Sequence, residues 1–355
     1  MKILWLAHRD IFNPKSGGAE RTIYEVTRRL SKMGFEVTVV SASWAKSKNR
    51  EQIDEVKLLR LGSSIVVHLC VPFIILFGKY DVVVNDLAHI VPWVSSSIFK
   101  KKTIVFFRHL HSRSLPGQVN KMSGWILASL EKCYCIFYRT ASFVTESDTS
   151  INDLIGLSIP RERIYKIPPG VDWQLFKLGK KTNYPSIVYF GGLREYKRPE
   201  ESLRVLSNIS DKISGIHLFI IGDGPKLPHL KKLAKELKLE DMVTFTGRIL
   251  DSRLASLVSS AWLNIHASVT EGWGLSVVEA SACGTPTVAY DVPGINEVIK
   301  DGINGYKIRD GDVKQFIDAV ERVILAPERL WQSSVLAVTK FTWEISVELW
   351  RKLLV

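Results

Sequence analysis

Residues 1–41 read MKILWLAHRDIFNPKSGGAERTIYEVTRRLSKMGFEVTVVS. The apolar run over 2–7 predicts a buried strand, and a pair of glycines interrupts the chain after it. Apolar residues then recur at helical spacing over 21–33, and a β-branched strand is expected over 36–41. Further strands follow, and a long helix is expected over 125–138. Buried strands that alternate with amphipathic helices predict an α/β fold with a parallel sheet.

The same alternation starts again in the second half of the chain. Prolines and glycine at 168–170 and a polar stretch at 177–184 interrupt the pattern, as an interdomain linker would. Beyond them we expect strands over 186–190, 217–221 and 243–246. We therefore predict two Rossmann-like domains, over 1–170 and 171–340, and a terminal helix over 341–355. Two such domains would face each other across a cleft, with the carboxyl ends of their strands toward it.

Length and cysteine usage limit the class of protein. The chain has 355 residues, enough for two ordinary domains. Its four cysteines are scattered and form no C-x-x-C pair, so neither a disulfide framework nor a structural zinc site is expected. This usage predicts a reduced, cytoplasmic protein. The apolar start is too short for a secretory signal, and the run over 65–77 falls short of the about 20 residues that span a bilayer.

The positive charge is unevenly distributed. The net charge is +12, and residues 1–175 hold 24 Lys and Arg against 15 Asp and Glu. Nucleic acid, an anionic membrane surface or a phosphorylated substrate could account for this excess. A basic surface that binds nothing is the alternative.

The glycine pair Gly17-Gly18 stands between the first expected strand and the first helix. Glycine allows backbone N–H groups to approach a phosphate, and the start of a helix carries partial positive charge. A simple turn explains the pair equally well.

A second glycine loop follows the strand over 186–190 and reads GGLREYKR over 191–198. Its cations, which include Arg194 and Lys197, suit a diphosphate whose negative charge grows as it leaves. The alternative is a solvated basic loop.

The most informative stretch is VTEGWGLSVVE over 269–279. Glu271 lies in a glycine-rich loop, and Glu279 lies eight positions later in the expected helix. Loop amides and a helix start can bind phosphate, and each carboxylate can accept hydrogen bonds from sugar or ribose hydroxyls. A capping Glu and a surface Glu would be the alternative, which the punctuation by Gly272, Trp273 and Gly274 makes harder to sustain.

This stretch resembles the E-x7-E signature of GT-B glycosyltransferases of the retaining family 4, also called glycosyl transferases group 1. Further phrases of the chain are similar to those of the family and occur in the same order, so that the resemblance covers essentially the whole chain. They are GGAE over 17–20, PGVD over 169–172 with Phe176, IGDGP over 221–225, VTFTG over 243–247 and DGING over 301–305.

The resemblance implies a role for each matching position. Glu271 would bind hydroxyls of the donor sugar, Glu279 would hold the ribose, and Lys197 would neutralise the diphosphate. A histidine after the strand over 103–107 would face the sugar, with His109 preferred and His111 as its rival. The remaining substrate contacts come from glycine loops, a helix start and the base site: Gly17, Gly18, Arg194, Gly247, Arg248, Gly272, Gly274 and Leu275.

Two positions depart from the family pattern. The family has an arginine where this chain has Gly192, and Arg194 two residues later could replace it. The asparagine of the family's linker phrase is replaced by Pro169.

The resemblance implies a hexosyltransferase that moves a sugar from a UDP- or GDP-sugar with retention of configuration, without a metal or other cofactor. No D-x-D phrase offers metal ligands. The implied terminal helix over 341–355 crosses back to the first domain. A nonhydrolysing sugar-nucleotide epimerase of the same architecture is one alternative. A basic nucleic-acid-binding protein is another, against which stands the absence of any nucleic-acid motif.

The acceptor is expected to be lipid-linked or a glycan, at the cytoplasmic face of the membrane. Apolar stretches at 65–77 and 90–99 beside lysines 100–102 suit docking on an anionic bilayer. The alternative is that both stretches are core helices.

Overall fold

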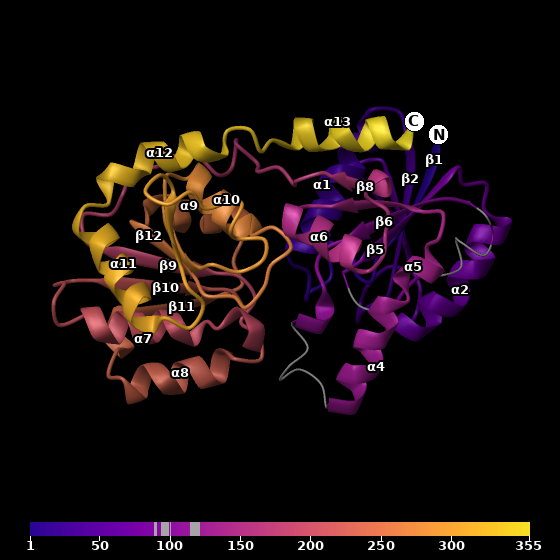
Figure 1. Cartoon of the computed structure of the whole chain (residues 1–355). Helices are drawn as coiled ribbons and strands as arrows, with labels where there is room; N and C mark the ends of the chain where they lie inside the picture. The colour runs from indigo at the N-terminus through magenta and orange to yellow at the C-terminus, as the bar shows by residue number, and fades with distance from the viewer. Residues whose placement is uncertain (89–90, 94–98, 100, 114–120) are drawn as a thin grey trace. The chain divides into compact units, whose positions relative to one another are not determined.

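A computed structural model describes residues 1–88, 91–93, 99, 101–113 and 121–355 (Figure 1). The chain divides into two compact units. The first contains Met1–Pro169 together with Trp343–Val355, and the second contains Gly170–Thr342. Each unit is built around its own twisted sheet, so we describe them one at a time.

The first unit holds a sheet in the order β3-β4-β2-β1-β5-β6-β7-β8. Among the described strands, β3 and β4 pair antiparallel and the remaining neighbours pair parallel. The bounds are β1 Lys2–Leu6, β2 Glu36–Ser41, β3 Arg50–Ile53, β4 Val56–Arg60, β5 Val82–Leu87, β6 Lys102–Phe107, β7 Ser142–Thr145 and β8 Ile164–Lys166. The central strands are buried almost throughout, because helices cover both faces of the sheet.

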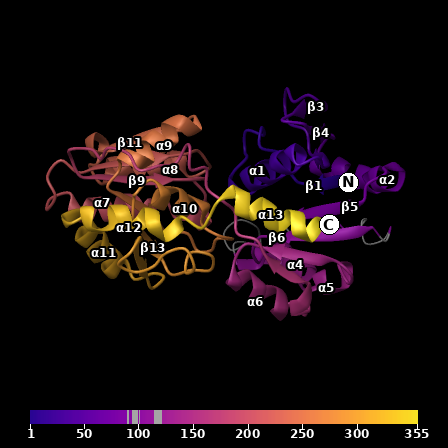
Figure 2. The ribbon, with the colours of Figure 1, turned by 90° about the horizontal axis from the view of Figure 1, so that it is seen from above.

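Two groups of helices cover this sheet (Figure 2). Helices α1 and α13 share one hydrophobic cluster with it, and α2, α5 and α6 share the other. The bounds are α1 Gly18–Lys32, α2 Ser64–Phe77, η1 His111–Arg113, α4 Lys121–Lys132, α5 Tyr134–Phe137, α6 Asp148–Gly156, η2 Arg161–Arg163 and α13 Trp343–Leu354. The single helix predicted over 125–138 is wrong, because the chain turns at Cys133, where α4 has ended and α5 begins.

The second unit holds a fully parallel sheet in the order β11-β10-β9-β12-β13-β14. Its strands are β9 Ser186–Phe190, β10 His217–Ile221, β11 Val243–Gly247, β12 Leu263–His266, β13 Thr287–Tyr290 and β14 Gly305–Ile308. Its helices are η3 Glu195–Lys197, α7 Glu200–Ile209, α8 Leu227–Glu236, η4 Glu240–Met242, α9 Asp251–Ser260, α10 Leu275–Ala282, α11 Val313–Leu325 and α12 Glu328–Val338. The predicted α/β class with two parallel sheets is confirmed.

The last helix, α13, belongs to the first unit although the second unit precedes it in sequence. The ring of Trp350 lies 5.0 Å from that of Trp5 on β1 and 5.2 Å from that of Phe106 on β6. Lys102 Nζ also donates to the carbonyl of Leu354, 2.7 Å away. Aromatic burial of this kind makes α13 part of the first core rather than a loose tail.

Candidate active site

The second unit gathers its candidate residues where two neighbouring strands end. Strands β9 and β12 are hydrogen-bonded to each other, so the loops that follow them meet at one edge of the sheet. The loop after β9 leads to Lys197, and the loop after β12 leads to Glu271. Val269 N donates to the carbonyl of Tyr196 over 2.8 Å and joins the two loops.

Glu271 forms the centre of this cluster. Its Oε1 is ion-paired with Lys197 Nζ, accepts a hydrogen bond from Ser268 Oγ, and lies 2.9 Å from His266 Nε2. The side chains of Lys197 and Glu271 are 18% and 12% exposed, so the charges are largely removed from water. Such a pair survives burial because polar neighbours satisfy the carboxylate.

The two charges hold each other ionised. Burial alone would raise the pKa of the Glu271 carboxyl, but Lys197 and the His266 hydrogen bond lower it far below its usual range. Burial opposes the charge of Lys197 as well, and Glu271 nevertheless raises the pKa of that amine. The site therefore presents a permanent cation and a permanent hydrogen-bond acceptor side by side.

Glycines allow the loop after β9 to lie against its neighbour. Gly222 has φ +136°, and a Cβ there would stand 2.0 Å from the carbonyl oxygen of Gly191. Leu193 N donates to the carbonyl of Asp223 over 3.0 Å, which ties the loops together. Contact this close between two backbones excludes any side chain at Gly222.

Arg194 lies next to the position at which the family arginine is missing. Its Nε is 3.6 Å from where a Cβ on Gly192 would be. The side chain thus turns back over Gly192, into the space that a residue there would use. Arg194 is also close enough to Lys197 to lower the pKa of that amine slightly, against the larger effect of Glu271.

Helix α10 starts at the same edge of the sheet. Gly274 is its N-cap with φ +81°, and a Cβ there would meet Ile295 Cδ1 at 2.6 Å. Leu275 is the first helical residue, and Glu279 is buried one turn later. Gly272 lies between Glu271 and this helix start, so backbone N–H groups and two carboxylates share one short segment.

The predicted base site lies where β11 ends. Gly247 closes this strand with φ +65°, and its carbonyl accepts from Gly222 N over 3.0 Å. Arg248 is exposed and lines a surface hollow with Ile249, Leu250 and Arg253. An open hollow beside the last strand of the sheet can receive a planar group.

In the first unit, Gly17 and Gly18 are exposed and form the start of α1. Gly17 N donates to Glu20 Oε2 over 2.8 Å, and Glu20 Oε1 accepts from Arg9 Nε over 2.9 Å. Glu20 itself is buried. Its carboxylate therefore fixes the glycine turn from within, and leaves the loop surface open.

A buried charge cluster supports that turn from the neighbouring strands. Arg108 follows β6 and binds Asp86 at 2.9 Å and Glu146 at 2.6 Å, from the ends of β5 and β7. Its third contact is the carbonyl of Ala19 in α1, at 3.2 Å. Burial raises the pKa of Asp86 to about 6, although Arg108 counteracts this. The strand ends and the glycine turn are thereby held together.

The two candidate histidines differ in their surroundings. His111 is buried; its Nε2 lies 3.0 Å from the carbonyl of Leu87, and its backbone N donates to Glu131 over 2.6 Å. Burial lowers the pKa of His111. His109 is half-buried, and the two ring centroids are 4.8 Å apart. His111 therefore has a structural position, and His109 is the ring with an accessible face.

The structure brings several predicted residues together and adds others. Lys197, Arg194, Glu271 and the start of α10 share one edge of the second sheet, and Gly17, Gly18 and His109 lie at strand ends of the first. Sequence reasoning missed His266 and Ser268, which hold Glu271, and Arg108. A charged residue directly after a buried strand was the signal for Arg108, and no local pattern announced His266.

Comparison with known proteins supplies an independent test. A family model described as Glycosyl transferases group 1 matches residues 172–332, and one described as Glycosyltransferase Family 4 matches residues 16–175. The two matches follow one another along the chain and meet where its two units divide.

Curated relatives share the family but vary in length. The chain is 22% identical to a phosphatidylinositol N-acetylglucosaminyltransferase of Arabidopsis thaliana, covering 91% of this chain and 74% of the relative. It is 28% identical to D-inositol 3-phosphate glycosyltransferase of Mycolicibacterium smegmatis, covering 58% of this chain and 50% of the relative. The chain thus spans about half the length of the relatives of the second kind.

Solved structures show the same fold. Sucrose-phosphate synthase from Thermosynechococcus elongatus superposes with a TM-score of 0.83 at 18% identity, over 99% of this chain and 98% of the other. Anabaena HepE in complex with UDP-glucose superposes with a TM-score of 0.78 at 18% identity, over 99% of both chains.

Proposed function

This chain is a glycosyltransferase of family 4, the glycosyl transferases group 1, that uses a nucleotide sugar, and we propose that it transfers a hexose from a UDP- or GDP-sugar to a lipid-linked or glycan acceptor. Family membership decides for transfer over the epimerase and over a nucleic-acid-binding protein. The identity of donor and acceptor is the substance of the proposal.

The observation that carries the proposal is the buried Lys197–Glu271 pair beside the start of α10. A diphosphate would take over Lys197 as its counter-ion, and the backbone N–H groups at Gly274 and Leu275 would bind its remaining oxygens. Glu271 would then accept hydrogen bonds from sugar hydroxyls in place of the Lys197 amine. The exchange keeps both buried charges satisfied, with and without donor.

Nucleoside recognition would fall to the rest of the same edge. We assign the ribose hydroxyls to Glu279 and the base to the segment at Gly247 and Arg248. Arg194 would supply the positive charge that the family pattern places at residue 192, because its side chain already covers Gly192. HepE, which has the same fold, was solved with UDP-glucose, and this supports a nucleotide donor.

The first unit would supply Gly18, which approaches the phosphates, and His109, which faces the sugar. We propose retention of configuration with attack from the face of the leaving group, so that Glu271 binds substrate and does not act as a nucleophile. Cationic side chains and the start of a helix would stabilise the departing diphosphate in place of a divalent ion. The reaction would take place at the inner face of the cell membrane, with the protein bound peripherally.

Calorimetric titration with UDP and with GDP, in the presence of EDTA, tests the donor site. We expect one of the two to bind in the micromolar range, about 8 kcal/mol. Glu279→Ala should weaken it, whereas Glu321→Ala, which removes an exposed ion pair on α11, should not. If neither nucleotide binds, with or without Mg²⁺, the proposed donor site is wrong. Binding that appears only with Mg²⁺ would refute the metal-free mechanism alone.

A further inference from the structure

Helix α2 in the first unit exposes an apolar face. It is 14 residues long with the sequence SIVVHLCVPFIILF, and it contains no Lys, Arg, Asp or Glu. Val67, Val71 and Ile75 point into the core. The other side carries six exposed large hydrophobic residues, and Leu69 is 66%, Phe73 63% and Phe77 78% exposed. The remaining three are Ile65, Val66 and Leu76.

This exposed set follows helical geometry. Ile65, Leu69, Phe73 and Leu76 are spaced by four, four and three residues, so they form one stripe along the helix. Apolar side chains of this size and number on one exposed face mark an interaction surface. The core does not need them, because a separate stripe of α2 packs on the sheet.

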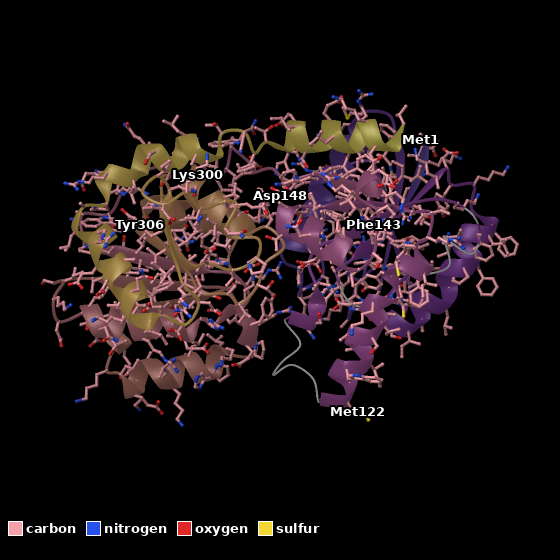
Figure 3. The ribbon with its side chains drawn as sticks, in the orientation of Figure 1. Met1, Met122, Phe143, Asp148, Lys300 and Tyr306 are labelled. Atoms are coloured by element: carbon pink, nitrogen blue, oxygen red, sulfur yellow. The ribbon has the colours of Figure 1, made fainter. Side chains whose placement is uncertain are left out.

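Helix α4 carries a second exposed apolar group in the same unit. Met122 and Trp125 are both 73% exposed, and Ile126 is 48% exposed. Figure 3 labels Met122 at the far end of α4, where the helix projects from the unit. Figure 1 shows α2 and α4 both on the lower side of this unit.

The charge around these helices has one sign. Residues 56–80, which contain α2, include Lys57, Arg60 and Lys79 and no Asp or Glu. Residues 87–130, which contain the exposed group of α4, include six Lys and Arg and again no Asp or Glu. Cations without carboxylates beside apolar side chains match an anionic lipid surface. A protein interface would instead be depleted in lysine.

We propose that the exposed apolar faces of α2 and α4 form one surface that inserts into an anionic lipid bilayer. The α2 helix is about 21 Å long at 1.5 Å per residue, which is too short to span a bilayer and suits a position in the plane of the interface. Within the described residues, no helix is long and apolar enough to cross a membrane. The occupant of this surface is therefore the outer layer of the lipid, and not a membrane-spanning groove.

The surface is connected to the candidate site. Glu131, the buried carboxylate near the end of α4, accepts from the backbone N of His111 at 2.6 Å and of Ser112 at 3.1 Å. The helix that would lie in the lipid thus holds η1, which directly follows the His109 loop. Delivery of a lipid-linked acceptor to this loop rests on the proposed transferase function, whereas the lipid binding does not.

Flotation of the full chain with vesicles tests the surface. Equimolar phosphatidylcholine and phosphatidylglycerol should bind the wild type at low salt, and added salt or pure phosphatidylcholine should weaken binding. Leu69→Glu with Phe73→Glu should lower the partition coefficient by at least about tenfold, because two inserting side chains become charged. The matched control is Leu325→Glu with Leu336→Glu, whose leucines are both 72% exposed in the second unit, and it should float like the wild type. Brominated lipid should quench the wild type more than Trp125→Phe.

Three results would overturn the proposal. The wild type could fail to bind anionic vesicles, or the α2 variant could bind as the control does. Alternatively, the wild type could be a dimer in light scattering that the α2 variant converts to a monomer without any vesicle binding, which would make the surface a self-association site. Calorimetry with UDP and GDP on the same variants separates the proposals, because the second unit should bind nucleotide whatever the vesicles show.

Discussion

Replacing Lys197 by Met tests the physical account of the donor site. The variant keeps most of the side-chain volume but leaves the Glu271 carboxylate, 12% exposed, without its counter-ion. Removing one partner of a buried ion pair costs about 3–5 kcal/mol of unfolding free energy. His266 and Ser268 still contact the carboxylate, so we expect the lower value, about 3 kcal/mol at pH 7.

The pH dependence gives this prediction its sign. In the wild type the pKa of Glu271 is lowered, so the stabilisation is complete above the unfolded pKa of about 4.3 and is lost below it. In Lys197→Met the remaining burial raises that pKa, so the variant takes up a proton and gains relative stability as pH falls from 7. The difference between the two proteins should therefore be largest near pH 7 and shrink toward about pH 4.5.

Urea denaturation followed by tryptophan fluorescence measures this difference, with Arg198→Met as the control. Arg198 also belongs to the loop after β9 and pairs with Asp310, but these side chains are 28% and 42% exposed. Exposed pairs contribute about 0–1 kcal/mol, so the control should lose little. Equal losses in both variants, or a Lys197→Met loss that does not change with pH, would refute the reasoning.

Three further substitutions test other parts of the structure by the same denaturation measurement. Gly222→Ala would place a Cβ 2.0 Å from a backbone oxygen and should cost at least about 3 kcal/mol, while Gly302→Ala, with no atom within 4 Å, should cost only the about 1–2 kcal/mol of its positive φ. Trp350→Ala should cost about 3–5 kcal/mol, because it empties the aromatic cluster under α13, whereas Ile345→Ala, at 51% exposure, should cost under about 1 kcal/mol. Arg108→Met should cost about 3–5 kcal/mol at pH 7 and less at low pH, because its two buried carboxylate partners then take up protons; a loss that grows on acidification would contradict this.

The sequence predicted the elements whose pattern is local. The strands over 186–190 and 217–221 coincide with β9 and β10, because buried parallel strands are apolar throughout. The helix over 125–138 was wrong, because an apolar periodicity does not reveal a turn such as that at Cys133. The strong glycine punctuation around Glu271 indicated the loop before α10 without any knowledge of its partners.

Contacts between distant strands could not be predicted. His266 and Lys197 reach Glu271 only because β12 lies beside β9 in the sheet, and the order of strands is not written in any local pattern. For the same reason, the three-way cluster of Arg108 with Asp86 and Glu146 appears only once β5, β6 and β7 are neighbours. The position of Arg194 over Gly192 likewise depends on how the loop turns.

Hydrogen–deuterium exchange of the full chain, with and without the nucleotide that binds in calorimetry, tests the central claim most directly. The account predicts slower exchange at residues 191–198 and 272–279, where Lys197, the start of α10 and Glu279 would hold the diphosphate and ribose. The helix α12 in the same unit should exchange unchanged. Nucleotide binding without protection of either segment would contradict the assignment of the donor site.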